Sequence, residues 1–431
     1  MNPIRTFLAA RRRQARDARF ADYHAAEKAD PQAEQLARFN RCWERLSANV
    51  PYYAGLVERQ LAPERFESWA QMIAALPVAD RPFIYANLPA LSDPSRPADS
   101  YRTTGGSTAE PVSLPAWHAE TAETESNEWM GRAWYGIDPA DACLRLWGHS
   151  HLLGRGLGGW INARLRETKD ALLGIERVSA YDLSDAALLG AWARLARSRA
   201  AYLVGYSAAL DRFARVAREA GREDRIPLKA VVATSESFPF PDSRETVEAA
   251  FGAPVAMEYG SVETGVLAHT RPGEGYHAFW LSYFIEATEP APQGGYKVRV
   301  TSLYPRAFPL VRYDLGDAIL LSEPAVGVRR FESVLGRSNA FLEFDGGERI
   351  HSEAISHAVK GTGPVSGYQM VQENGACRLR LTVLAPLAPA QVENLRERLA
   401  KIHPRLGAAR IETVERLEQT RAGKTPLIIR R

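Results

Sequence analysis

The chain has few cysteines, few lysines and no long apolar run, and each shortage excludes a class of protein. Its three cysteines, Cys42, Cys143 and Cys377, lie far apart and form no CxxC pair. That pattern favours a reducing compartment and provides no thiol-bound metal site. No apolar run approaches the ~20 residues that a membrane-spanning helix needs. We therefore predict a cytoplasmic protein that does not enter a membrane.

The net charge of the chain is also small. Its 431 residues include 54 basic and 51 acidic side chains, which leaves a net charge of +3. This balance argues against a nucleic acid or a membrane surface as the main partner. Nearly all basic residues are arginines, so each lysine carries more information than usual. The arginine-rich N-terminus is interrupted by Asp17, Asp22 and Glu27 and lacks an apolar core, which predicts a solvated helix rather than a transit peptide.

Hydrophobic periodicity predicts an α/β fold with more than one domain. The chain is longer than the roughly 250–300 residues at which a single core stops growing. Residues 33–48 place apolar side chains at helical spacing, and residues 186–260 alternate helices with strands, which indicates parallel pairing. The pattern turns to strands from 276 to 320. We predict a large domain over residues 1–337, with a parallel βαβ sheet and a β-rich subdomain, and a small α+β domain over residues 338–431.

The strand ends within residues 186–260 point to a binding site. Ser207 is predicted to cap the helix that follows the first strand, and Gly221 is predicted to end that helix. Ligands of parallel sheets bind at the carboxyl ends of the strands. Those ends are the polar runs Thr234–Ser237 and Tyr259–Glu263, which we take as candidate ligand contacts.

Residues 103–111 read Thr-Thr-Gly-Gly-Ser-Thr-Ala-Glu-Pro and cannot bury apolar surface. Two adjacent glycines would lose too much entropy in a helix or strand without a purpose. The run therefore predicts a loop whose amides and hydroxyls wrap an anion, most often a phosphate. A plain surface turn is the alternative.

A second glycine-rich stretch lies in residues 142–160, after a short predicted strand. Its Gly154-x-Gly156-x-x-Gly159 pattern matches the dinucleotide fingerprint in form, but no acidic residue follows at the right distance, which disfavours a nicotinamide or flavin site. His149 and His151 lack a third candidate ligand nearby, so they fit hydrogen-bonded loop residues better than metal ligands.

A series of short motifs follows in order along nearly the whole chain: Thr104–Pro111, Ser235–Ser237, Tyr259–Glu263, Tyr313–Asp317, Gly336-Arg337 and Gly423-Lys424. They look like the phosphate loop S-S-G-T-T-G-K-P, an adenine-contacting turn, Y-G-x-T-E, Y-R-T-G-D, the G-R before an interdomain hinge, and a C-terminal G-K. In this order they resemble the adenylate-forming (ANL) superfamily, specifically its phenylacetate–CoA ligase and CapK-like branch.

The resemblance implies that ATP, Mg²⁺ and CoA are the cofactors, and it gives the motifs roles. The residues implied in nucleotide binding are Thr104, Gly105, Gly106, Ser107, Thr108, Ser235, Glu236, Ser237, Glu258, Tyr259, Gly260, Ser261, Asp317 and Arg337. Among them the loop residues would hold the phosphates, Tyr259 would lie beside the adenine, and Asp317 would accept both ribose hydroxyls with help from Arg337.

Catalysis and acid binding are assigned in the same way. Glu263 would ligate Mg²⁺, and Lys424 would bridge the substrate carboxylate and the α-phosphate as a point charge. The acyl pocket would lie among Trp147, His149, His151 and Gly156, beside the 235–237 turn. The domain over residues 338–431 would be a mobile lid.

The chain departs from the motifs at four positions. Ala109 stands for the usual glycine, Glu110 for the usual lysine, Val262 for a threonine, and Asn339 for an aspartate at the hinge. Only Glu110 reverses a charge, and it would repel a triphosphate if it pointed inward. These departures leave a slow, altered or lost adenylation activity open.

We predict an AMP-forming acid–thiol ligase that activates a small carboxylic acid as an acyl-adenylate and passes it to a thiol, with CoA as the leading acceptor. Aromatic and glycine content suggests an aryl or short planar acid. Two alternatives remain: transfer to an amine, a carrier protein or a cofactor, and a nucleotide-binding relative without catalysis. A homodimer is an open prediction.

Overall fold

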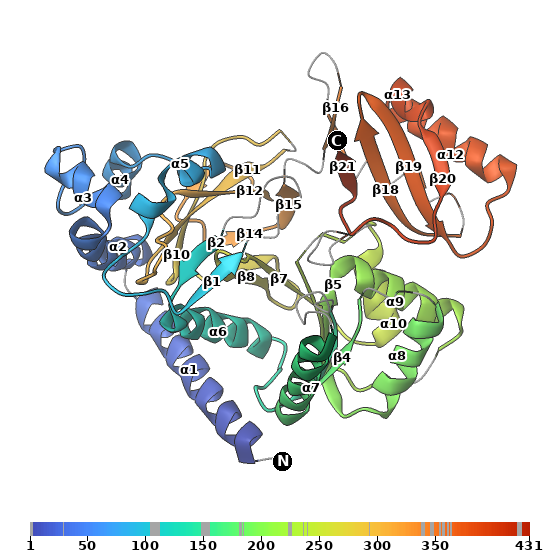
Figure 1. Ribbon diagram of the computed structural model, residues 1–431, viewed down its shortest axis with the longest axis horizontal. Coiled ribbons are helices and arrows are strands. Elements are labelled where there is room, and N and C mark those ends of the chain that lie inside the picture. Colours follow the sequence, from blue (N-terminus) through green and yellow to red (C-terminus); the bar gives the residue numbers. More distant parts are fainter. Residues whose placement is uncertain are drawn as a thin grey trace. The chain divides into compact units, whose positions relative to one another are not determined.

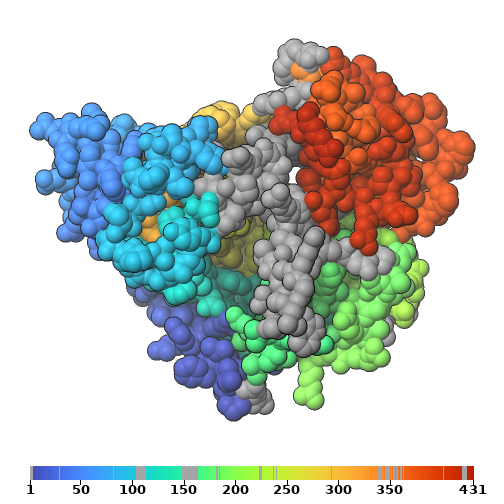
Figure 2. All heavy atoms as spheres, in the orientation of Figure 1, coloured from blue at the N-terminus to red at the C-terminus, as the bar shows by residue number. Residues whose placement is uncertain are grey.

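Contacts along the chain divide it into two units, which are described separately. Unit 1 combines Met1–Thr6, Ala140–Met257 and Arg337–Arg431, and unit 2 combines Phe7–Pro139 and Glu258–Gly336. The computed structural model describes residues 3–28, 30–103, 113–147, 156–180, 183, 185–222, 226–235, 237–238, 240–292, 294–337, 341–344, 349–352, 355, 358–359, 362, 364–419 and 425–431. The other residues are grey in Figures 1 and 2.

Helices cover the first part of unit 2. They are α1 (Pro3–Glu27, which begins in unit 1), α2 (Pro31–Asn49), α3 (Pro51–Glu58), α4 (Trp69–Ala75), α5 (Arg81–Leu91) and α6 (His118–Ala133). The apolar stripe predicted for residues 33–48 is buried in α2, where Phe39, Trp43 and Leu46 are at most 4% exposed. Asp30 caps this helix by accepting a hydrogen bond from the Gln32 amide at 2.9 Å.

The arginine-rich N-terminus forms the predicted helix, but that helix is not solvated on all sides. Arg19 and Tyr23 of α1 are buried, and Arg19 pairs with Glu123 of α6 at 2.5 Å. Arg12 and Arg13 pair with Glu125 and Asp138. Most of the helix is exposed, as predicted. Local patterning could not reveal that these arginines meet carboxylates more than a hundred residues away.

Two sheets and a hairpin complete unit 2. The hairpin pairs β1 (Ser100–Thr103) with β2 (Ser113–Ala116). The second half of β7 (Val255–Ser261) continues into an antiparallel ladder with β8 (Gly265–Thr270), β9 (Tyr276–Ala278) and β14 (Arg330–Phe331). A five-stranded sheet has the order β13 (Ala325–Val326), β10 (Tyr283–Ala287), β11 (Tyr296–Ser302), β12 (Tyr313–Leu320) and β15 (Ser333–Arg337). The strands predicted from 276 to 320 are confirmed.

Unit 1 contains the predicted parallel sheet. Its central strands, in the order β6, β5, β3 and β4, pair in parallel. The elements are β3 (Ala142–Leu146), α7 (Gly156–Leu173), β4 (Ile175–Val178), α8 (Asp185–Arg197), β5 (Ala200–Tyr206), α9 (Ser207–Glu219), β6 (Ala230–Thr234) and α10 (Ser243–Phe251), followed by β7. The α/β class predicted from the alternation is therefore confirmed.

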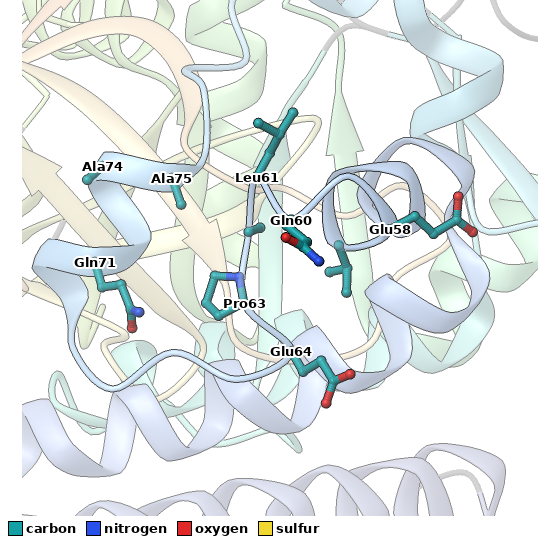
Figure 3. Close-up of a pocket in the computed structure, with 10 residues that line it drawn as sticks. Glu58, Gln60, Leu61, Pro63, Glu64, Gln71, Ala74 and Ala75 are labelled. Carbon is teal, nitrogen blue, oxygen red and sulfur yellow. The ribbon is translucent and has the colours of Figure 1, made fainter.

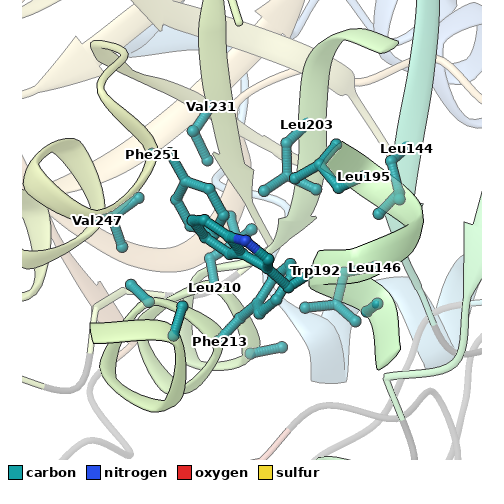
Figure 4. Packing of buried hydrophobic residues seen from close by; sticks show 14 of the residues in the cluster. Leu144, Leu146, Trp192, Leu195, Leu203, Leu210, Phe213, Val231, Val247 and Phe251 are labelled. Atoms are coloured by element: carbon teal, nitrogen blue, oxygen red, sulfur yellow. The ribbon is translucent and has the colours of Figure 1, made fainter. Parts of the chain in front are cut away.

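Large apolar side chains fill the space between this sheet and its helices. Trp192 stacks on Phe251 with ring centroids 5.5 Å apart, and Phe213 meets Phe251 edge to face at 5.1 Å (Figure 4). The helix after β5 ends near Gly221 as predicted, where φ is +61°. Its predicted cap was wrong by one residue, because Tyr206 occupies the N-cap position and Ser207 is already helical.

The C-terminal part of unit 1 forms the predicted α+β arrangement. It contains β16 (Phe341–Glu343), β17 (Arg349–His351), β18 (Val365–Glu373), β19 (Ala376–Val383), α12 (Pro389–Ile402), α13 (Pro404–Gly407), β20 (Arg410–Thr413) and β21 (Ile428–Arg430). The sheet order is β20-β19-β18-β21. The domain boundary predicted near residue 337 stays a prediction.

Candidate active site

A tight turn between β7 and β8 in unit 2 carries Glu263. Two reciprocal hydrogen bonds between Ser261 and Thr264 close the turn. The Ser261 amide donates to Thr264 Oγ1 at 3.0 Å, and the Thr264 amide donates to Ser261 Oγ at 3.2 Å. Gly260 is required here because a Cβ at this position would lie 1.9 Å from the carbonyl oxygen of Gly265. The glycine of the Y-G motif therefore permits the close approach that forms the turn.

The Glu263 side chain and backbone are both anchored. Glu263 is 3% exposed, and its Oε1 accepts a hydrogen bond from the Tyr313 hydroxyl at 2.9 Å. Its carbonyl oxygen accepts one from Arg306 Nη2 at 2.5 Å. Tyr313 begins the Tyr313–Asp317 motif, so two motifs that lie 50 residues apart in the chain meet at this carboxylate.

Asp317 lies on a distorted part of β12. Lys297 pairs with Ala318 and Arg299 with Asp314, so three residues of β12 stand opposite Val298. Gly316 makes this bulge possible with φ at +72°. Bulges reorient side chains next to active sites, and here the result is that Asp317 Oδ2 accepts a hydrogen bond from the Tyr259 hydroxyl at 3.1 Å. Tyr259 and Asp317 are both buried.

Arg312, just before this motif, is a structural residue that the sequence analysis missed. Its guanidinium binds Glu286 at 2.9 Å and donates to the carbonyl oxygens of Ile73 and Leu76 at 2.8 and 2.6 Å. It also adopts φ of +48°, which is uncommon for a residue with a side chain. These contacts hold the start of β12, and through it Asp317, against the helical part of unit 2.

A second missed group links the hairpin to the Glu263 turn. Glu120 of α6 is 1% exposed, and its Oε2 lies 3.4 Å from both Arg306 Nη2 and Arg102 Nη2. Its Oε1 accepts hydrogen bonds from the Trp117 and Ala307 amides. Arg102 belongs to β1, directly before the predicted phosphate loop. One buried carboxylate therefore connects that hairpin to Arg306, which holds the Glu263 carbonyl.

Glu258, predicted to contact the nucleotide, is engaged inside the protein. Its Oε1 accepts a hydrogen bond from Arg132 Nε at 2.8 Å, and both side chains are buried. His269 Nε2 lies 3.9 Å from the same oxygen. Burial of His269 lowers its pKa to about 4, so the imidazole is neutral near pH 7. Nucleotide contact by Glu258 stays a prediction.

Unit 1 contributes the other described candidates. Ser235 follows β6 with φ of +76°, a strained conformation of the kind that occurs at ligand sites. Ser237 is exposed. Trp147 follows β3 and packs on Tyr206 with ring centroids 4.4 Å apart, and Gly156 begins α7. The predicted acyl-pocket role of Trp147 and Gly156 stays a prediction.

Several predicted site residues lie outside the described residues. They are Thr104, Gly105, Gly106, Ser107, Thr108, His149, His151, Glu236 and Lys424. The ends of the phosphate loop are described, because Thr103 pairs with Ser113 in the hairpin. Arg337 is described only as the last residue of β15, the strand next to β12.

The flanks of Lys424 are anchored by one buried side chain. Gln369 of β18 is fully buried and donates from Nε2 to the carbonyl oxygens of Glu418 at 3.0 Å and Pro426 at 2.9 Å. Its Oε1 accepts a hydrogen bond from the Glu418 amide at 3.1 Å. Both sides of the segment that contains the lysine are therefore fixed to the C-terminal sheet.

The described residues were also searched for metal sites and membrane spans. Among them, no group of three or more histidine, cysteine, aspartate or glutamate side chains could hold a metal ion. Within the same ranges, every helix is too short or too polar to cross a bilayer.

Comparison with solved structures identifies the class of fold. At 18% identity, 2-hydroxyisobutyryl-CoA ligase in its postadenylation state with 2-HIB-AMP is similar over 92% of this chain and 89% of its own, with a TM-score of 0.67. The same ligase with 2-HIB-AMP and CoA in the thioesterification state is 19% identical, over 94% and 90%, with a TM-score of 0.57. An anthranilate-CoA ligase in complex with anthranoyl-AMP is 15% identical, over 76% and 65%, with a TM-score of 0.53.

The fold is therefore that of the adenylate-forming enzymes, as the order of motifs predicted. Neither a protein-family model nor a curated protein matches the chain. The phenylacetate–CoA ligase and CapK-like branch stays a prediction.

Proposed function

We propose that this protein is an AMP-forming acid–thiol ligase that uses ATP. In the first half-reaction, a carboxylate oxygen of a small acid attacks the α-phosphorus of ATP and the bond to pyrophosphate breaks. In the second, a thiol attacks the acyl carbonyl carbon and AMP leaves. CoA is the leading thiol, and an aryl or short planar acid is the leading substrate.

The hydrogen bond between Tyr259 and Asp317 is the observation that carries this proposal. It joins two motifs whose residues lie 58 positions apart, in a fold shared with ligases that bind acyl-AMP. An ionised carboxylate can accept several hydrogen bonds, so Asp317 can receive the Tyr259 hydroxyl and still accept two ribose hydroxyls. Tyr259 would then lie beside the adenine.

Glu263 suits a single-carboxylate contact to Mg²⁺. Tyr313 binds its Oε1, and Mg²⁺ is commonly held by one or two carboxylates together with substrate phosphates. The ion would supply positive charge to the phosphates. The chain holds the Glu263 carboxylate in place through the turn at Gly260 and through the contact of Arg306 with the Glu263 carbonyl oxygen.

Lys424 would provide the charge that stabilises the transferring α-phosphate. Adenylation spreads negative charge over the phosphates, and a preorganised cation lowers that barrier. Because Gln369 anchors both flanks of the lysine segment, movement of the C-terminal sheet would carry Lys424 toward or away from the reacting atoms.

Pyrophosphate release from a panel of carboxylic acids, with and without CoA, tests the proposal. We expect acid-dependent release of pyrophosphate, and acyl-CoA only when CoA is present. Parallel reactions with amines and with a carrier protein test the other acceptors. No pyrophosphate release with any acid, in a protein that still binds ATP by calorimetry, would instead favour a nucleotide-binding protein without catalysis.

A further inference from the structure

A cavity of about 400 Å³ lies in unit 2 away from the Tyr259–Asp317 pair. Its walls come from the last turns of α1 and α6, from Arg271 after β8, from residues 277–280, and from residues 321 and 325–330. Two adjacent residues on β9 show on which face of the sheet the cavity lies. Tyr276 packs on Phe331 with ring centroids 5.0 Å apart, on the side of Tyr259, whereas His277 lines the cavity. Successive side chains of a strand point to opposite faces, so the cavity lies across the sheet from Tyr259.

Aromatic rings form much of the cavity wall. Trp134 stacks on Phe279 with ring centroids 5.9 Å apart, and Trp280 meets Tyr23 edge to face at 5.3 Å. Trp134 is only half-buried, so part of its ring surface is available to a ligand. A flat aromatic molecule would gain both apolar burial and ring contacts here.

Arginines stand over these rings. The guanidinium carbon of Arg271 lies 4.4 Å from the Trp134 ring centroid, and that of Arg329 lies 5.8 Å from the Trp280 centroid. Arg330 is at the rim with its side chain 73% exposed. Among the described residues, the buried Nε of Arg271 has no hydrogen-bond partner. A donor held in this position without an acceptor suits an anionic ligand.

Acidic groups do not neutralise this cluster. One carboxylate, that of Glu27, lines the cavity, and a second, that of Glu274, lies outside the lining beside Arg330. Glu274 is already hydrogen-bonded to His277 Nε2 at 2.6 Å and lies 3.9 Å from Arg330. His277 itself stays neutral near pH 7, because burial lowers its pKa. Three arginines therefore face two carboxylates, and one of those carboxylates is shared.

A second hollow of unit 2 shows the contrast (Figure 3). It lies between α3 and α4, and its lining has no aromatic ring and no basic side chain. Glu58 and Glu64 are its charged residues. Nothing in that hollow selects a ligand, whereas rings and unneutralised arginines occur together in the first cavity.

We propose that the cavity beneath Trp134 and Arg271 binds a small planar aromatic carboxylate. The ring would contact the part of Trp134 that Phe279 and Arg271 leave exposed, and the carboxylate would accept hydrogen bonds from Arg271 and Arg330, since guanidinium groups match carboxylates in geometry. The volume is at the small end of ligand pockets, which fits a one- or two-ring acid. This site is separate from the candidate active site and does not depend on the proposed ligase activity.

Calorimetry of the full chain without nucleotide tests the site, with 2-naphthoate as the probe. We expect saturable binding that becomes about tenfold weaker or more in Arg271→Gln, because a charged hydrogen bond is lost. The uncharged 2-naphthamide and the non-planar cyclohexanecarboxylate should each bind about tenfold more weakly than 2-naphthoate. Arg410→Gln, which removes an exposed arginine of the C-terminal sheet, should bind as the parent does.

Two results would overturn the proposal: no binding of 2-naphthoate at millimolar concentration, or equal binding by Arg271→Gln and the parent chain. The second result would mean that the acid binds elsewhere, for example in the predicted acyl pocket. If Arg271→Gln does not fold by circular dichroism, Arg330→Gln decides, because its exposed side chain is not needed for folding. That variant should weaken binding about threefold, and an unchanged affinity would refute the site.

Discussion

The turn that carries Glu263 and the segment that carries Lys424 are held in different ways. Buried side chains from two directions hold the first, with Tyr313 on the carboxylate and Arg306 on the carbonyl oxygen. One side chain of the C-terminal sheet, Gln369, holds both flanks of the second. Groups proposed to bind the nucleotide are therefore positioned before a ligand arrives, whereas Glu418 and Pro426, on either side of Lys424, are fixed only to the C-terminal sheet. Substitutions near the turn should change nucleotide affinity, and those near the lysine should change the rate of one half-reaction.

The largest effect is expected from Lys424→Ala. Loss of one preorganised charge should slow adenylation by ~10²–10³ or more. Transfer from a supplied acyl-adenylate to CoA should stay nearly intact, because the proposed role of Lys424, to bridge the carboxylate and the α-phosphate, belongs to adenylation alone. The two half-reactions are measured separately. Equal slowing of both half-reactions would mean that the lysine has a structural role. The contrast between the Glu263 turn and the Lys424 segment would then have no basis.

Asp317→Ala should give the next largest effect, and on affinity instead of rate. Loss of charged hydrogen bonds worth ~1.5–3 kcal/mol each should weaken ATP binding by about one to three decades. Calorimetry with ATP measures this directly. Glu323→Ala, which removes an exposed carboxylate of the same unit, is the control and should bind ATP normally. Normal ATP affinity in a folded Asp317→Ala chain would defeat the assignment of this residue.

Sequence patterns could predict the parts of the molecule that depend on local spacing. The stripe of α2, the alternation of strands and helices and the order of the motifs all follow from neighbouring residues. The side chains that hold the site were missed because their partners are distant. Glu120 receives a hydrogen bond from the Ala307 amide, 187 positions away, and Arg312 meets Glu286, 26 positions away, from a left-handed backbone conformation. The periodic pattern of apolar residues in the sequence does not reveal such pairs.

The C-terminal element β21 was missed for a related reason. It contains three residues, Ile428–Arg430, and pairs in parallel with β18. So short a run has no detectable alternation, and only the neighbouring strand makes it a strand. Near this pairing, Gln369 of β18 donates to the carbonyl oxygen of Pro426, and no sequence pattern singles out that glutamine.

Acid should weaken unit 2 through His269. Its pKa is about 4 in the folded chain against an ordinary value of 6.5, so the unfolded chain binds the proton more readily. Stability is then lost as pH falls from about 6.5 to about 4, by about 3 kcal/mol in total. Urea unfolding measures the loss in the free energy of unfolding between pH 7 and pH 4. In His269→Gln this loss should be smaller than in the parent chain by about that amount. An unchanged difference would mean that the imidazole is charged or exposed.

Hydrogen exchange would sharpen this comparison between regions. Amides of β8 and β9, which lie around His269, should lose protection in acid before those of β18 and β19 do. Simultaneous loss in both regions would show that the two are one cooperative unit under these conditions.

Gln369→Leu should slow adenylation by about tenfold. The substitution removes three hydrogen bonds and leaves the backbone groups of Glu418 and Pro426 without their partner, at roughly 1–3 kcal/mol for each buried group. ATP affinity should not change. Gln391→Leu is the control, since it removes one hydrogen bond at the start of α12, in the same region, and does not touch the segment. A rate equal to that of the control would show that the flanks of Lys424 do not need Gln369.

The smallest effect is expected from Tyr259→Phe, which keeps the ring and removes only the hydroxyl. Asp317 would lose one hydrogen bond at 3.1 Å but keep its carboxylate for the ribose. One such bond contributes roughly 0.5–1.5 kcal/mol, so ATP affinity should fall by about two- to tenfold, less than in Asp317→Ala. Tyr52→Phe removes the same atom from a tyrosine of α3 that packs edge to face on Phe83 of α5, elsewhere in unit 2, and should leave ATP affinity unchanged. If Tyr259→Phe instead weakens ATP as much as Asp317→Ala does, the carboxylate depends on the tyrosine for its position, and the nucleotide side is less firmly preorganised than its burial indicates.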